Sequence, residues 1–127
     1  MLRFFSLTTR ILFSSLIGSS ALSAQEAGFE KDVQPFLEQH CVRCHGEEKQ
    51  KGDLNILELS TDFTAGSDAE LWHEVIPRMG SGEMPPDDEP DLPSADESNQ
   101  IMEWLSARIQ EGKAARAAQR PDVALYR

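Results

Sequence analysis

Residues 41–46 read CVRCHG and contain both cysteines of this 127-residue chain, together with one of its three histidines. The chain that follows the first two dozen residues is about one hundred residues long, enough for one small domain. At that size a hydrophobic core alone gives marginal stability, and small domains usually add a metal or a cofactor. We therefore expect the fold to be organised around a metal or a cofactor held by Cys41, Cys44 and His45.

Four kinds of site could account for the two cysteines at this spacing and the histidine that follows them. A structural zinc site needs further ligands, usually a second pair, and neither His40 nor His73 forms one. A thioredoxin-like redox pair lies beside a βαβ pattern, which this sequence lacks. A disulfide between Cys41 and Cys44 would close a very small loop and stabilise little. Covalent attachment of haem accounts for every residue, because the thiols add to its vinyl groups and His45 becomes the proximal iron ligand.

A haem iron held by one histidine has a sixth coordination position to fill. Met84 is the preferred ligand because it lies in GEMPP, a loop without helical periodicity, where Pro85 favours an extended backbone. The alternative role for Met84 is to fill a gap in the core. The remaining candidates lie within helices or directly beside the attachment site: Met79, Met102, His40 and His73.

Apolar periodicity predicts three helices, within FEKDVQPFLEQHC, within SDAELWHEVIPRMG and from SADE onward. The second and third each begin with a capping box, Ser67 with Glu70 and Ser94 with Glu97. Pro77 predicts a break or a tightened last turn in the second helix. The third helix is expected to continue through the alanine-rich KAARAAQ.

The segments between these helices are long, and SGEMPPDDEPDLP has four prolines. Loops of this length are uncommon in a compact domain unless something else organises them. The sequence therefore predicts an all-α architecture, a few helices connected by long loops.

The first 24 residues have the order of a secretory signal peptide. Two arginines without an acid precede an apolar run of about a dozen residues, and small residues follow. That run is too short to span a bilayer. We expect a periplasmic or otherwise exported protein after cleavage, with no membrane span in the mature chain.

Without the signal peptide the chain has ten basic and 22 acidic residues, a net charge of about −12. Such a surface repels nucleic acid and anionic lipid, and it favours redox partner proteins with basic docking faces. The acidic run in residues 87–91, just after Met84, is either a solvated loop or part of a docking surface.

Two side chains are candidates for holding the haem propionates, because buried carboxylates need hydrogen-bond donors. Trp72 and Arg78 belong to the helix that leads into the Met84 loop, and Lys51 is a further cation. The alternatives are core packing for Trp72 and a solvated position for the two cations.

Over about residues 28–110 the chain resembles the planctomycete-type cytochrome c domain, a class I c-type cytochrome. Three segments carry the resemblance: FEKDVQPFLEQHCVRCHGEEKQKGDLN, LWHEVIPRMGSGEMPP and IMEWL. The resemblance implies thioether bonds at Cys41 and Cys44 and axial iron ligation by His45 and Met84. It also implies an all-α, cytochrome c-like fold of three to four helices, with long loops wrapped around one covalently attached haem and with the crossed N- and C-terminal helices of cytochromes c. In this sequence the crossing would pack Phe36 and Leu37 against Trp104 and Leu105.

The predicted function is one-electron transfer by an exported monohaem cytochrome with His/Met-ligated iron, alone or within a larger assembly, and not catalysis. The alternatives are a haem enzyme or sensor with an open sixth position, and a non-haem domain with a Cys41–Cys44 disulfide. The predicted organisation is a signal peptide (1–24), a cytochrome c domain (25–112) and a helical or disordered C-terminal extension (113–127).

Overall fold

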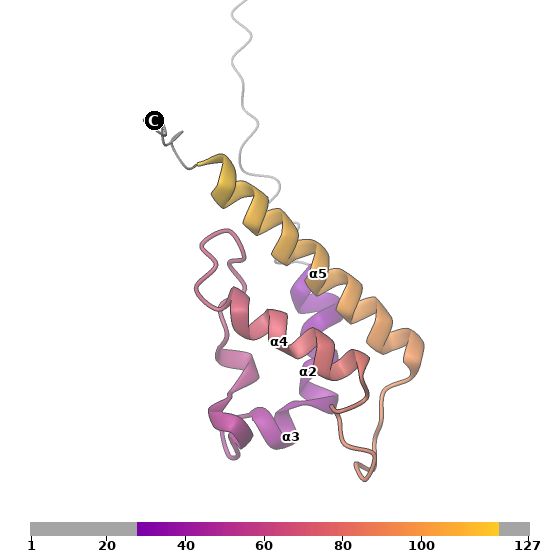
Figure 1. Ribbon diagram of the computed structural model, residues 1–127. Helices are drawn as coiled ribbons and strands as arrows, with labels where there is room; N and C mark the ends of the chain where they lie inside the picture. The colour runs from indigo at the N-terminus through magenta and orange to yellow at the C-terminus, as the bar shows by residue number, and fades with distance from the viewer. Residues whose placement is uncertain (1–27, 120–127) are drawn as a thin grey trace, which may run out of the picture.

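Residues 28–119 are described by a computed structural model (Figure 1). Their α-helices are α2 (Gln34–His40), α3 (Val42–His45), α4 (Ala69–Gly80) and α5 (Ala95–Ala118). A π-helical turn, η1 (Phe29–Val33), precedes α2, and two 3-10 turns, η2 (Lys51–Asp53) and η3 (Ile56–Glu58), follow α3. Between residues 28 and 119 there is no strand, and the predicted all-α fold is confirmed.

The first predicted helix is η1 and α2 together, with a change of hydrogen bonding between them. Pro35 is the second residue of α2 and has no N–H to donate. The N–H of Gln34 instead reaches back five residues to the carbonyl of Phe29, which makes the preceding turn π-helical. The helix buries three side chains along one face: Val33, Phe36 and Leu37.

The start of α4 differs from the prediction. The helix begins at Ala69 after Asp68, and no side chain caps it, so the capping box predicted at Ser67 and Glu70 is wrong. The carboxylate of Asp68 instead accepts a hydrogen bond from the backbone N–H of Ser60, 2.7 Å away, and so fixes the preceding loop.

The predicted break at Pro77 is also absent, since α4 continues to Gly80. Proline removes one hydrogen bond, to the carbonyl of His73 four residues earlier. His73 is exposed, so water can take the place of the missing donor. The backbone N–H of Ser81 then bonds to the carbonyl of Pro77, 2.9 Å away, and closes the last turn.

The capping box of α5 is confirmed. The hydroxyl of Ser94 accepts from the N–H of Glu97, and the Glu97 carboxylate accepts from the Ser94 hydroxyl and N–H. These bonds from Ser94 hold the pKa of Glu97 below its usual value. Their contribution is therefore present above the unfolded-state pKa of glutamate and is lost as the pH falls through the lower folded value.

The third helix continues through KAARAAQ as predicted, because α5 reaches Ala118. Its last turns contact the loop before α4, where the guanidinium of Arg116 donates to the carbonyl of Phe63. Gly112 allows this approach, since a Cβ at that position would overlap the same carbonyl. The division at residue 112 falls inside α5 and stays a prediction.

Aromatic rings at the centre of the core join the N-terminal helix, α4, α5 and the loop before α4. Trp72 is fully buried, and its ring centroid lies 6.0 Å from that of Phe29 and 6.2 Å from that of Phe63. Trp104 of α5 contacts the same two rings, at 6.0 and 6.1 Å. Leu37 and Leu105 belong to this core, and Phe29 of the N-terminal helix contacts Trp104 of α5.

In Figure 1, α5 forms one side of the molecule, and α4 lies between it and α3. In this view α3, which carries part of the predicted haem-attachment motif, therefore lies on the far side of α4 from α5. No helix of the described residues is long and apolar enough to cross a membrane. The predicted signal peptide lies outside the described residues, as do residues 120–127.

Candidate haem site

A cavity of about 360 Å³ opens between the attachment segment, the turns after it, α4 and the loop that follows α4. Its lining includes Cys41, Cys44, His45 and Met84, which the sequence analysis singled out. Five apolar side chains form much of the remaining wall: Phe36, Leu54, Ile56, Val75 and Met79. The volume lies within the range of roughly 300–1,000 Å³ that is usual for small-molecule and cofactor pockets.

The attachment segment is one helical turn. The N–H groups of Cys44 and His45 both donate to the carbonyl of Cys41, at 3.1 and 2.9 Å, which brings the two cysteines to the same wall. Both thiols are free, and burial raises the pKa of Cys41 to about 11, so that this thiol is protonated at neutral pH. Gly46 then turns the chain away, where a Cβ would collide with the carbonyl of Val42.

The imidazole of His45 has an unpaired buried atom. Its Nδ1 is buried and has no hydrogen-bond partner in the structure. A buried polar atom without a partner is rare and destabilising, and it calls for a specific explanation. An iron ion bound at Nδ1 would satisfy this atom directly, whereas iron bound at Nε2 would leave Nδ1 in need of a hydrogen-bond acceptor.

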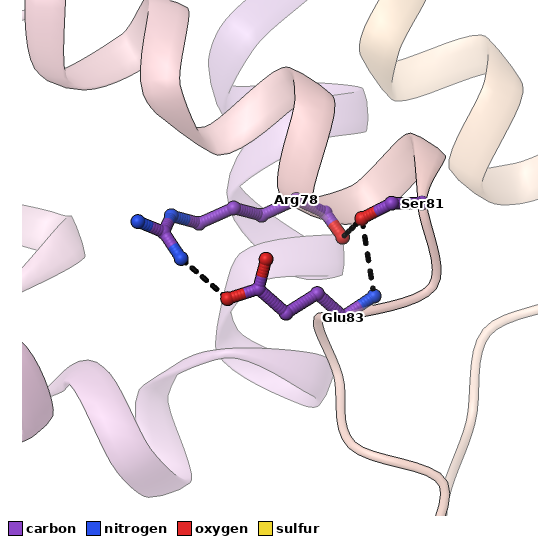
Figure 2. A network of polar contacts seen from close by, with 3 residues as sticks. All are labelled: Arg78, Ser81 and Glu83. Carbon is purple, nitrogen blue, oxygen red and sulfur yellow. Dashed lines mark hydrogen bonds and ion pairs between the residues drawn. The ribbon is translucent and has the colours of Figure 1, made fainter.

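Met84 is held in place by the end of α4. Its N–H donates to the carbonyl of Arg78 at 3.0 Å, and its peptide bond to Pro85 is cis. Figure 2 shows the surrounding contacts, in which the guanidinium of Arg78 pairs with the carboxylate of Glu83. The Ser81 hydroxyl donates to the Arg78 carbonyl and accepts from the N–H of Glu83. The backbone that carries Met84 is thus attached to α4 at several points.

The cavity contains a second thioether, because Met79 of α4 also lines it. The two methionines differ in their surroundings. Met79 packs against the hydrophobic core from within a helix, whereas Met84 lies on a partly buried loop. Met79 therefore has a packing role already, and it provides a natural control for Met84.

Of the two predicted propionate donors, the structure places Arg78 at the cavity and Trp72 away from it. Trp72 does not line the cavity, and its Nε1–H donates to the carbonyl of Ser60 at 3.0 Å. Its single donor is used inside the core, so we do not retain Trp72 as a site residue. Arg78 lines the cavity with a half-exposed side chain, as does the exposed Lys51, and both stay candidates.

Sequence reasoning missed the contacts of the acidic run after Met84. Glu89 lines the cavity and pairs with Arg43, 2.6 Å away, and Asp91 contacts Gln39 and His40 at the end of α2. The sequence did contain a signal for this contact. Opposite charges pair, and a basic residue lies between the two cysteines while an acidic run follows the methionine. Their proximity required the fold to be known.

Two thiols, an imidazole and a thioether on the walls of one largely apolar cavity fit a covalently attached haem. The helical architecture and this site define the class of protein, an all-α cytochrome c-like domain. Residues 41–88 match the family model described as planctomycete cytochrome C, and this match supports a planctomycete-type cytochrome c domain in the chain. The matched range includes the four predicted haem residues. No curated protein and no solved structure matched the chain.

Proposed function

We propose that this protein is an exported monohaem c-type cytochrome that passes single electrons between redox partners. The observation that carries the proposal is the cavity itself, onto which the fold brings Cys41, Cys44, His45 and Met84. Haem c bound there would supply a one-electron Fe(III)/Fe(II) couple.

Cys41 and Cys44 would hold the cofactor. Each thiol would add across one vinyl group, with the sulfur bonded to one vinyl carbon and the hydrogen to the other. This addition has no leaving group and transfers no net electrons. The single turn between the two cysteines fixes their separation.

His45, from the attachment turn, and Met84, from the loop after α4, would hold the iron. Apolar side chains in the cavity wall would limit the access of water to the bound iron. Arg78 and Lys51 provide cations at the cavity for the propionates. Cytochromes c with Met/His ligation have raised reduction potentials, which suits a carrier.

The acidic composition supports redox partners with basic docking faces, and export supports a periplasmic location, where haem c is attached in bacteria. The two thiols and the His45 imidazole that line the cavity are used by the proposed cofactor, so we propose electron transfer and not catalysis.

A redox titration of the haem-loaded protein tests this proposal. We expect one reversible step that follows a one-electron Nernst curve, with a six-coordinate low-spin spectrum in both oxidation states. A resting protein with a five-coordinate spectrum, which binds added ligands without displacing a sulfur, would instead identify a sensor or an enzyme.

A further inference from the structure

The loop that carries Met84 has two halves with different partners. Its first half, residues 81–84, is bound to α4, the helix that it leaves. Its second half, residues 86–91, contacts α2 and α3 through Glu89 and Asp91. The second half therefore connects the methionine loop to the segment that carries Cys41 and His45.

Three contacts make this connection, which we call the clasp. Arg43 Nη1 lies 2.6 Å from a carboxylate oxygen of Glu89, and Gln39 Nε2 donates to the Asp91 carboxylate at 2.9 Å. The Nδ1 of His40 lies 3.0 Å from the backbone carbonyl of Asp91. The clasp is thus formed by side chains directly before and between the two attachment cysteines.

The contacts are selective among the acidic residues of the loop. Glu89 and Asp91 take part, whereas Asp87 and Asp88, on the same loop, have no side-chain hydrogen bond or ion pair within residues 28–119. The Glu89 side chain is 21% exposed, so its charge is held against Arg43 rather than spread into solvent. A loop that only needed solubility would not distinguish its carboxylates in this way.

We propose that the clasp positions Met84, by keeping the loop closed over the cavity, and so controls how easily an external ligand replaces the methionine. This inference rests on the proposed haem ligation. In the exchange, a nitrogen of the incoming ligand bonds to the iron as the neutral thioether of Met84 leaves, and no electron is transferred. An external ligand binds only when the loop is open, so its apparent affinity rises with the open fraction.

The experiment is a titration of the ferric, haem-loaded protein with imidazole, followed by the loss of the long-wavelength sulfur-to-iron band. Glu89→Gln is compared with Asp88→Asn, which removes one negative charge from the same loop without breaking a contact. We expect Glu89→Gln to lower the half-saturating imidazole concentration about two- to fivefold relative to Asp88→Asn. A double variant, Glu89→Gln with Asp91→Ala, should lower it about tenfold relative to Asp87→Ala with Asp88→Asn.

The pair itself is tested by a double-mutant cycle. If Arg43 acts through Glu89, the combination of Arg43→Gln and Glu89→Gln should change imidazole binding no more than either single substitution. Additive effects would show that the two residues act separately and would overturn the clasp. The clasp would also be overturned if the Glu89 variants bound imidazole with the same affinity as their Asp88 controls.

Failure of the clasp can be told apart from failure of the proposed function. A wild-type protein with the sulfur-to-iron band and clasp variants equal to controls overturns only the clasp. A haem-loaded wild-type protein without that band removes Met84 as a ligand, and the clasp is overturned with it.

Discussion

Replacement of Met84 by alanine is expected to abolish the long-wavelength sulfur-to-iron band of the ferric protein and to open the sixth coordination position to added imidazole. The reduction potential should fall by on the order of 0.1 V, because axial ligands set haem potentials over a range of about 0.8 V. The covalent haem should remain, since Cys41 and Cys44 are untouched. Absorption spectra, imidazole binding and a redox titration measure the three effects.

Met79→Ala is the matched control, because it removes the other thioether that lines the cavity. Met79 packs against the core, so this change should lower the free energy of unfolding by about 2–5 kcal/mol and leave the band in place. If Met79→Ala removed the band and Met84→Ala kept it, the ligand would be assigned to α4. If both variants kept it, neither methionine would be the ligand.

Trp72→Ala is expected to reduce the free energy of unfolding by about 3–5 kcal/mol, the cost typical of a buried aromatic residue. Trp72 is completely buried between Phe29 and Phe63, and its Nε1–H is bonded to the Ser60 carbonyl. Leu57→Ala, at a side chain that is 43% exposed, should cost less than about 1 kcal/mol. Urea unfolding of the haem-loaded proteins gives both values.

The milder Trp72→Phe variant separates a core role from a propionate role, and it keeps the test valid if the alanine variant does not fold. We expect a loss of about 1–2 kcal/mol, from the hydrogen bond and a small cavity, with no measurable change in reduction potential. A clear shift in potential at unchanged ligation would mean that the indole contacts the cofactor, which contradicts its position in the structure.

The two predicted capping boxes show how far sequence could determine the fold. Ser94 with Glu97 and Ser67 with Glu70 have the same spacing, yet only the first forms. The difference is tertiary, because Asp68 is engaged by the backbone of Ser60, which fixes the chain just before α4. Helix positions follow from apolar periodicity, whereas their exact starts depend on contacts with distant segments.

The candidate site was predictable where chemistry restricts the residue type. Cysteine, histidine and methionine are few in this chain, so the thiols, the imidazole and the thioether loop could be assigned before the cavity was seen. Trp72 could not be placed, because an indole N–H serves a core carbonyl and a propionate equally well. The clasp could not be predicted either, since charged residues are abundant and the pairing of Arg43 with Glu89 spans 46 positions.

The central claim is that Cys41 and Cys44 hold one haem covalently, and a single mass measurement tests it most directly. The protein is expressed with cytochrome c maturation machinery, denatured, and weighed beside a double variant, Cys41→Ser with Cys44→Ser. We predict that the wild type has the polypeptide mass plus one haem and that the variant has the mass of the polypeptide alone. A wild-type product that is colourless and unmodified, while a control cytochrome matures normally, would contradict the account.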